Sequence, residues 1–310
     1  MFKKFTFSFF AFLHFYATAQ SADSSMMVFR QAEQELSQLQ QKAFFSRKES
    51  DRIQGNKEFL AVWARIIPNP KIMDYSFTSL KEISILSPKD EKFKLITWNL
   101  QRDDGTHAFF GFLLVNNRKR IKKGLFKYEN KDEYEYFLLI DRSATVKSPE
   151  TYVGSADKWF GMLYTQLVEC DGFYTLIGWD GNDKLTQRKF IDVLYFKSNG
   201  VPVFGKDVFK FPKKNPKRLM FECAQEVNMS VKYNEKRNQI VYSHLAPRQV
   251  GTLLEGQFQY YGPDGSFDAL ELKRDRWVLI ENIDINSGIE PLKDSKKPDP
   301  KKQQPVYKPK

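Results

Sequence analysis

Apolar residues between positions 26 and 70 recur with the spacing of two amphipathic helices. In the first segment the intervals are four, four, three and four positions, which places on one helix face Val28, Ala32, Leu36, Leu39 and Ala43. The second apolar set comprises Phe59, Leu60, Trp63, Ile66 and Ile67, and the prolines that follow end the helix. With the polar stretch 46–56 as a connection, the sequence predicts a helical hairpin over 26–70. A partner-binding coiled-coil arm is the alternative, although the apolar seam lasts only about two heptads.

From residue 76 onward the pattern changes to the alternation that is typical of β-strands. The runs span 93–100, 108–115, 134–140, 162–168, 174–179, 191–196, 227–233, 239–244, 257–261, 267–272 and 277–283. Turn signals separate many of them: Asp103-Asp104-Gly105, Asn116-Asn117, Asp171-Gly172, Asp180-Gly181, Asn199-Gly200 and Pro263-Asp264-Gly265. Asp-Gly and Asn-Gly between apolar runs indicate hairpins, because both turn positions need positive φ.

About a dozen short strands joined by hairpins predict a mainly β domain over 76–286, an antiparallel meander that closes as a sandwich or barrel. A β-propeller-like fold is the alternative, since Trp98-Asn99 and Trp179-Asp180 both lie near strand ends beside a glycine turn. No matching sites recur at a propeller's period of about 40–50 residues. One β domain preceded by a helical hairpin is therefore the preferred interpretation.

The first 19 residues have the three parts of a secretory signal peptide. Lys3 and Lys4 precede the apolar run 5–16, and a small-x-small site at 17–19 predicts cleavage between Ala19 and Gln20. The run is shorter than the ~20 residues that span a membrane, and no cysteine lies beside the cleavage point to take a lipid. We expect an exported chain that is periplasmic or associated with the cell surface, is not a lipoprotein, and has no transmembrane segment after cleavage.

Charge and proline content distinguish the C-terminal end. The chain of 310 residues has a formal net charge of +11, and the segment 287–310 holds seven lysines, five prolines and three acids. Prolines prevent regular structure, so we expect a disordered tail, with contact to an anionic surface as the alternative. Nucleic acid is not an expected partner, because basic residues elsewhere are interspersed with acids.

The sequence contains few residues suited to common active-site chemistry, and no cofactor is expected. Of the three histidines, one lies in the signal peptide, and His107 and His244 lack metal-ligand spacing, so no metal site is predicted. Residues 180–184 place oxygen-bearing side chains at alternate positions, but Lys184 stands where a calcium loop needs a third ligand. Cys170 and Cys223 form a disulfide or remain free thiols; export permits the bridge.

The sequence leaves two further kinds of site possible, a carboxylate pair and an aromatic platform. Paired carboxylates for glycoside hydrolysis require convergence of acids drawn from Glu169, Asp171, Asp180, Asp183 and Glu222. A stacking platform for sugars could be built from the aromatic side chains Trp159, Trp179, Tyr260 and Tyr261, although cross-strand packing is their commoner role.

The segments 174–182 (YTLIGWDGN) and 256–264 (GQFQYYGPD) resemble a group of exported β-rich proteins of Bacteroidota that have no assigned activity. The resemblance covers roughly 93–284 and implies an envelope location and a β-rich fold, without catalytic residues. We therefore expect a non-catalytic binding or accessory protein of the cell envelope, with an envelope protein or a glycan as partner. Its expected contact residues are Trp179, Asp180, Asn182, Tyr260 and Tyr261. A polysaccharide-active hydrolase with paired carboxylates is the alternative.

Overall fold

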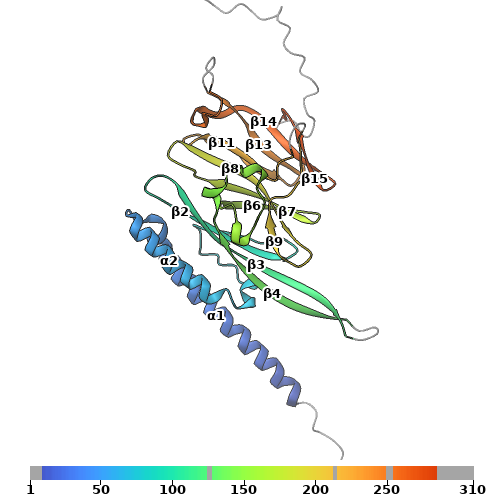
Figure 1. The fold of residues 1–310 in the computed structure, drawn as a ribbon. Helices are drawn as coiled ribbons and strands as arrows, with labels where there is room; N and C mark the ends of the chain where they lie inside the picture. Colours follow the sequence, from blue (N-terminus) through green and yellow to red (C-terminus); the bar gives the residue numbers. More distant parts are fainter. Residues whose placement is uncertain (1–8, 124–127, 212–214, 249–253, 285–310) are drawn as a thin grey trace, which may run out of the picture.

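Two N-terminal helices and three antiparallel sheets make up the fold. The computed structural model describes residues 9–123, 128–211, 215–248 and 254–284. Helices α1 (Phe9–Phe45) and α2 (Glu49–Ile66) pair as a hairpin, and the short η1 (Pro70–Asp74) follows them. The helices lie against one end of a stack of sheets, as Figure 1 shows. The mainly β class and the preceding helical hairpin are confirmed.

Sheet 1 is an up-and-down meander of four strands: β1 (Ser84–Leu86), β2 (Phe93–Gln101), β3 (His107–Lys122) and β4 (Tyr128–Ile140). Sheet 2 has the order β5-β9-β8-β7-β6, with strands β5 (Gly154–Ser155), β6 (Leu163–Cys170), β7 (Phe173–Asp180), β8 (Thr186–Phe196) and β9 (Pro202–Phe204). A further strand, β11 (Leu219–Ala224), pairs with the first half of β8.

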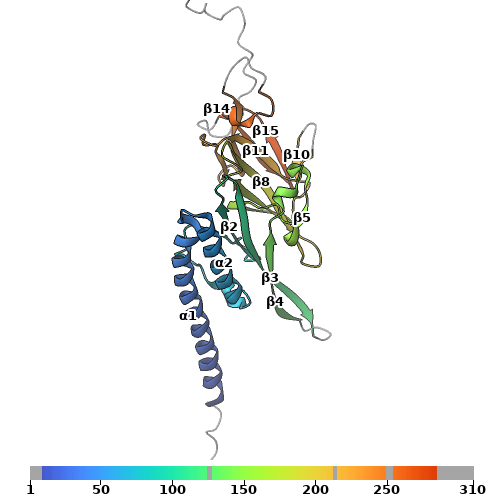
Figure 2. The same ribbon diagram turned by 60° about the vertical axis from the view of Figure 1, so that its left-hand side comes forward.

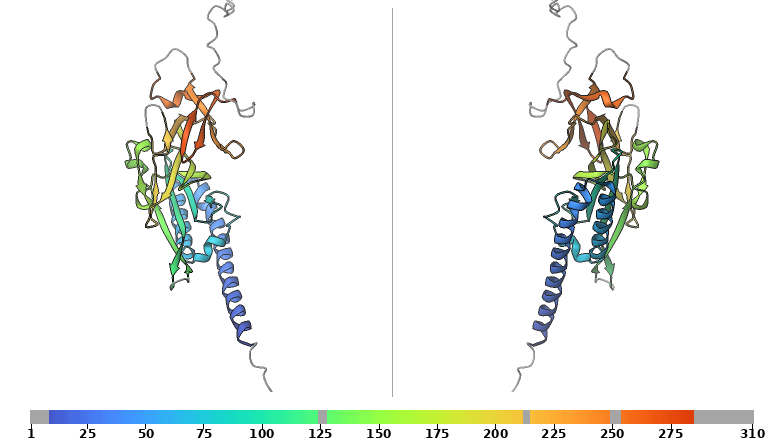
Figure 3. Two further views of the ribbon diagram at one scale, coloured as in Figure 1. Left: turned by 90° about the vertical axis from the view of Figure 1, so that its right-hand side faces the viewer. Right: turned by 90° about the vertical axis from the view of Figure 1, so that its left-hand side faces the viewer.

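Sheet 3 completes the stack in the order β10-β15-β14-β13-β12. Its strands are β10 (Phe209–Lys210), β12 (Val231–Asn234), β13 (Gln239–Pro247), β14 (Tyr261–Lys273) and β15 (Arg276–Ile280). Only β10 runs parallel to its neighbour. Each sheet is open, and the three follow one another as the layers of a sandwich (Figures 1, 2 and 3). The propeller alternative is therefore wrong for the described strands.

Three apolar cores separate the four layers. The helices pack on sheet 1 through a core that includes Phe29, Trp63 and Trp98. Neighbouring positions on β2 and β3, such as Leu95 and Leu113, point the other way into a core shared with sheet 2. Sheets 2 and 3 enclose the third core. Because sheets 1 and 2 are covered on both faces, their central strands read as nearly continuous apolar runs.

The hairpin differs from its sequence prediction in three respects. Val28 is exposed and its neighbour Phe29 is buried, so the buried face of α1 begins one residue later than expected. The stretch 46–56 is mostly helical, because α2 begins at Glu49. Its polar residues have partners: Arg52 donates to two carbonyls of the connection after α1 and to Gln101 O, and Asn56 Oδ1 accepts from Trp98 Nε1 at 2.8 Å. These contacts join the hairpin to sheet 1, so it is not a separate coiled-coil arm.

Two predicted turns are wrong. Asn116-Asn117 lies inside β3, which pairs with β4 to position 122. Pro263-Asp264-Gly265 is a bulge within β14, where the register with β13 shifts, and the preceding 258–260 is a 3₁₀ turn rather than a strand. Asp264 stabilises the bulge by accepting from the Ser266 N–H and hydroxyl. The Asp264 carboxylate thus accepts from the Ser266 N–H, a backbone donor that a hairpin turn would have paired with a backbone carbonyl.

The ends of the chain leave several sequence predictions untested. Ala19 and Gln20 lie within the backbone of α1, their side chains are not among those described, and signal-peptide cleavage stays a prediction. The tail 287–310 lies outside the described residues. Among the described residues, no helix combines the length and hydrophobicity that a membrane span needs.

Candidate functional site

A small polar cavity opens where the ends of β3 and β7 meet, between sheets 1 and 2. Its volume is about 260 Å³. Its wall includes two phenylalanines and a set of polar and charged side chains: Arg102, Asp104, Thr106, His107, Asp180, Asn182 and Arg188. The volume lies just below the ~300 Å³ at which sites for drug-sized ligands begin, so the cavity suits one small group.

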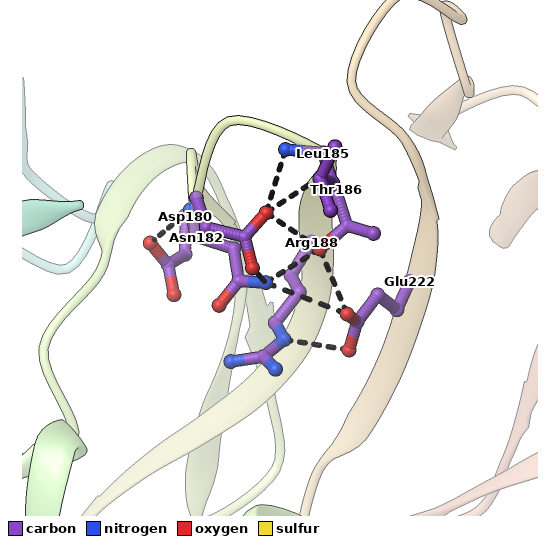
Figure 4. A network of polar contacts seen from close by, with 7 residues as sticks. Asp180, Asn182, Leu185, Thr186, Arg188 and Glu222 are labelled. Carbon is purple, nitrogen blue, oxygen red and sulfur yellow. Dashed lines mark hydrogen bonds and ion pairs between the residues drawn. The ribbon is translucent and has the colours of Figure 1, made fainter. Parts of the chain in front are cut away.

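Asp180, one of the residues expected from sequence, is the buried acid of this cavity. It ends β7, is 7% exposed, and its Oδ1 accepts from the Asn182 N–H at 2.8 Å. Among the described residues, no hydrogen bond reaches Oδ2, and Figure 4 shows this oxygen without a partner among the residues drawn. Burial raises the pKa of Asp180 to about 6, and nearby Asp141 and Glu222 contribute to the increase. One carboxylate oxygen is therefore available as an acceptor.

The turn after Asp180 is held by a network of side chains that reaches β11 (Figure 4). Asn182 adopts φ 49°, and its side-chain amide donates to Thr186 Oγ1, which in turn donates to Glu222 Oε1 at 2.8 Å. The other Glu222 oxygen accepts from Arg188 Nε, also at 2.8 Å. Glu222 is thus committed to structural contacts, whereas the two terminal nitrogens of Arg188 have no partner among the described residues.

His107 forms the opposite wall of the cavity and was not expected from sequence. Asn99 Nδ2 donates to its Nδ1 at 2.8 Å, which leaves the proton on Nε2. Burial lowers the pKa of His107, so the ring is neutral at pH 7. Gly181 lies against this ring: a Cβ there would come within 2.2 Å of His107 Nε2. Position 181 therefore requires glycine because the backbone passes so close to the His107 ring. The positive φ expected for this turn is at Asn182 and not at Gly181.

Asp141 lies next to the cavity and holds together the backbone segments that form part of its wall. Its carboxylate accepts backbone N–H groups of Phe109, Ser143 and Gly161, at 2.8–3.2 Å. With both oxygens occupied, Asp141 joins sheet 1 to the loops that lead into sheet 2. It influences Asp180 through its charge and offers no free acceptor.

The aromatic residues expected to act with Asp180 are divided between two places. Trp179 packs edge-on against His107, with ring centroids 5.3 Å apart, and its Nε1 donates to Gln187. Tyr260 ends the 3₁₀ turn before β14 and Tyr261 begins that strand of sheet 3, and among the described residues no ring contact links them to Trp179. Trp159 is fully buried. The four rings therefore do not form one platform, because they lie in different layers of the stack.

The predicted acids also separate. Glu169 and Asp171 lie at the opposite end of the β6–β7 hairpin from Asp180, where Cys170 pairs with Phe173. Asp183 accepts from Leu185 and Thr186 N–H groups within its own turn. Of the five predicted acids, only Asp180 has an unengaged oxygen in the cavity. Asp104, which was not among them, is the other carboxyl group in the wall, and its Oδ1 accepts from the Thr106 N–H and hydroxyl. Within the described residues, no cluster of three or more metal-binding side chains occurs.

Of the two alternatives left open for Cys170 and Cys223, the structure has the free thiols. Cys223 pairs with Gln187 near the Asp180 end of sheet 2, whereas Cys170 lies at its other end. Seven residues of β7 separate the two ends, a distance of roughly 23 Å at ~3.3 Å per residue, which no disulfide spans. Burial raises the pKa of both thiols to about 11, so both stay protonated and unreactive at neutral pH.

No protein-family model, curated protein or solved structure matches this chain. The function must therefore be argued from the chemistry of the Asp180 cavity. That cavity presents Asp180 Oδ2 as a buried-residue acceptor, with Asp104 and Asn182 also in its wall, and donors from His107 and Arg188 beside Phe109 and Phe160.

Proposed function

We propose that the protein is an exported, non-catalytic binding protein of the cell envelope, and that the Asp180 cavity holds one hydroxyl-bearing unit of a glycan. The unengaged oxygen of buried Asp180 is the observation on which this proposal rests. This oxygen is open to the cavity, where a ligand hydroxyl can replace water as its hydrogen-bond donor. Sugar hydroxyls both donate and accept, so they match Asp180 together with the free N–H groups of His107 and Arg188.

Binding is favoured over hydrolysis by the state of the neighbouring acids. Glycoside hydrolysis needs a second carboxyl group within roughly 5–9.5 Å of the acid, free to act as nucleophile or base. Asp141 and Glu222 are the carboxyl groups whose charges act on Asp180, and both are occupied by structural hydrogen bonds. Asp104, the other carboxyl group in the cavity wall, is held by Thr106 through Oδ1 and has no charge effect on Asp180. The raised pKa of Asp180 does match a general acid, so a hydrolase is the second candidate.

Calorimetric titration of the purified protein with glucose, galactose, mannose and N-acetylglucosamine tests the proposal. We expect at least one of them to bind at pH 7.5, and Asp180→Asn to weaken that binding at least tenfold, because a hydrogen bond to a charged group contributes about 1.5–3 kcal/mol. Asp157→Asn changes an exposed carboxylate elsewhere and should leave affinity unchanged. Absence of binding, or equal affinity for Asp180→Asn, would refute the site. Release of new reducing ends from oligosaccharides by the wild type alone would identify the hydrolase.

The same variant has an expected effect on stability. The pKa of Asp180 rises from about 3.8 to about 6 on folding. Between these values the folded state binds more protons than the unfolded state, so the free energy of unfolding decreases as pH rises through this window. Asparagine cannot ionise, and Asp180→Asn should therefore be about 1–3 kcal/mol more stable than wild type above pH 7. Urea unfolding at pH 4 and pH 7.5 measures the difference, which should disappear at the lower pH.

Export makes a separate prediction about the mature N-terminus. In α1 the described side chains that pack into the core begin at Met26, so removal of residues 1–19 takes none of them away. Expression in a Gram-negative host should yield a periplasmic or surface-associated protein whose N-terminal peptide, read by mass spectrometry, starts at Gln20. Recovery of intact protein with Met1 from the cytosol would contradict the envelope assignment.

A further inference from the structure

The buried carboxylate of Asp180 lacks a counter-charge as well as a second hydrogen bond. The residue is 7% exposed, and none of the ion pairs formed among the described residues includes it. Water and salt screen the charge of an exposed carboxylate, whereas a buried carboxylate is normally paired with a cation or bound to a metal ion. Within the part of the chain that the structure describes, Asp180 has neither.

The charges that act on Asp180 add up to an excess of acid. Asp141 and Glu222 raise its pKa through their charges, and Arg188 is the cation whose charge opposes them. Arg188 is itself paired with Glu222, with 2.8 Å between Nε and Oε2, so Glu222 offsets most of its charge. The carboxylates of Asp180 and Asp141 therefore keep a net negative charge in the buried part of the cavity.

The remaining charges of the wall lie at its exposed rim. Arg102 and Asp104 are both exposed, and the charges of Arg102 and Lys184 act on Asp104. Solvent screens these charges from the buried part of the cavity. They do not supply the cation that Asp180 lacks.

A protonated amine is the cation that suits this position. A calcium or magnesium ion needs several oxygen ligands, and the described residues contain no cluster of three or more metal-binding side chains. An ammonium group is compact and carries three N–H donors, so it can pair with the single open oxygen of Asp180 and keep water on its other donors.

The rest of the cavity indicates what the amine is attached to. The two terminal nitrogens of Arg188, which Figure 4 shows pointing away from Glu222, have no partner among the described residues and can donate to a hydroxyl oxygen. Asp180 and Arg188 are directly paired across the β7–β8 hairpin. An amine and a hydroxyl on neighbouring carbon atoms match this acceptor and donor, and 2-amino sugars have that arrangement.

We propose that the glycan unit held in the Asp180 cavity is an amino sugar, whose protonated amine pairs with Asp180 and whose adjacent hydroxyl accepts from Arg188. This inference rests on the proposed function, because it names the class of sugar for the same cavity. A hydrogen bond between two charged groups is roughly twice as strong as one between neutral groups, so the cavity should select the amine over a hydroxyl.

Calorimetric titration of the full-length protein at pH 7 with matched sugars tests the proposal. About nine-tenths of Asp180 is ionised at this pH. We expect glucosamine or galactosamine to bind at least tenfold more tightly than glucose or galactose, which carry a hydroxyl in place of the amine. N-acetylglucosamine, whose nitrogen is uncharged, should lose this advantage. Ethanolamine has the amine and the hydroxyl without the ring and should bind at least tenfold more weakly than glucosamine.

Asp180→Asn keeps a carbonyl acceptor and removes the charge, so the ratio of amino-sugar to neutral-sugar affinity should fall below about twofold. Asp157→Asn changes an exposed carboxylate and should keep the wild-type ratio. Equal wild-type affinities for glucosamine and glucose, equal affinities for ethanolamine and glucosamine, or a preference that persists in Asp180→Asn would overturn this inference. Binding of neutral sugars alone would overturn it and leave the proposed function standing, whereas failure of every sugar to bind would overturn both. The wild-type series decides the question even if Asp180→Asn does not fold.

Discussion

Replacing Arg218 with methionine should lower the free energy of unfolding by about 3–5 kcal/mol, the range for breaking a buried ion pair from one side. Arg218 and Asp192 have fully buried side chains, and Arg218 Nε donates to Asp192 Oδ1 at 3.0 Å. Arg218 Nη1 also donates to two carbonyls, those of Pro149 and Tyr152. Methionine fills similar space but leaves the Asp192 carboxylate without its counter-charge.

Tyr164 would not compensate for this loss. Its hydroxyl donates to the other Asp192 oxygen at 2.8 Å, and burial together with that carboxylate raises its pKa far above the ordinary value, so it remains a neutral donor. Chemical denaturation at pH 7 measures the effect. Lys273→Met removes an exposed pair with Glu271 and should change stability by less than about 0.5 kcal/mol. A loss for Arg218→Met as small as that of the control would show that Asp192 finds other partners or water.

Trp98→Ala should cost about 3–5 kcal/mol, because it removes a large buried ring at the junction between the helical layer and sheet 1. The Trp98 ring lies 5.2 Å from that of Phe59 on α2 and 5.9 Å from that of Phe110 on β3. Its loss also leaves Asn56 Oδ1 buried without its donor. We expect a lower midpoint in urea and earlier proteolytic cleavage within α1 and α2.

Two variants separate packing from the hydrogen bond at this position. Trp98→Phe retains an aromatic ring but lacks the Nε1 donor. It should therefore lower the free energy of unfolding less than Trp98→Ala does, while still leaving Asn56 Oδ1 without its hydrogen-bond donor. Phe45→Ala truncates an exposed ring at the end of α1 and should change stability little. If Trp98→Ala and Phe45→Ala had equal midpoints, the helices would not depend on sheet 1 for their stability.

Periodicity predicted the elements better than it predicted which side of them is buried. The helices and most strands follow from spacing and from turn glycines such as Gly105 and Gly172, which do adopt positive φ. Val28 and Phe29 are adjacent apolar residues, so spacing alone could not decide which one faces the core. Alternation also assumes that one face of a strand meets water, whereas β2 is covered on both faces, so even Lys94 in this strand is buried.

The candidate site was predictable only in part. Asp180 and Asn182 were visible as a polar turn after an apolar run, and that turn exists. Arg188 pairs with Asp180 across the β7–β8 hairpin, whereas His107 and Asp141 belong to sheet 1 and the loop after it, and the stacking of sheet 1 on sheet 2 brings these two near Asp180. Asn99, which sets the tautomer of His107, is its diagonal neighbour on the β2–β3 hairpin, and the correct strand register would have been needed to find it.

The sequential order of the layers restricts where this chain tolerates change. Each layer is a continuous stretch of chain, apart from β10 and β11, which alternate between sheets 2 and 3. Deleting an inner layer would bring together two apolar surfaces that are not complementary. Within the part of the chain that the structure describes, no further layer covers the outward face of sheet 3 or the solvent side of the helices. Insertions, fusions and sequence drift should therefore accumulate at the two ends of the stack and be rare between its sheets.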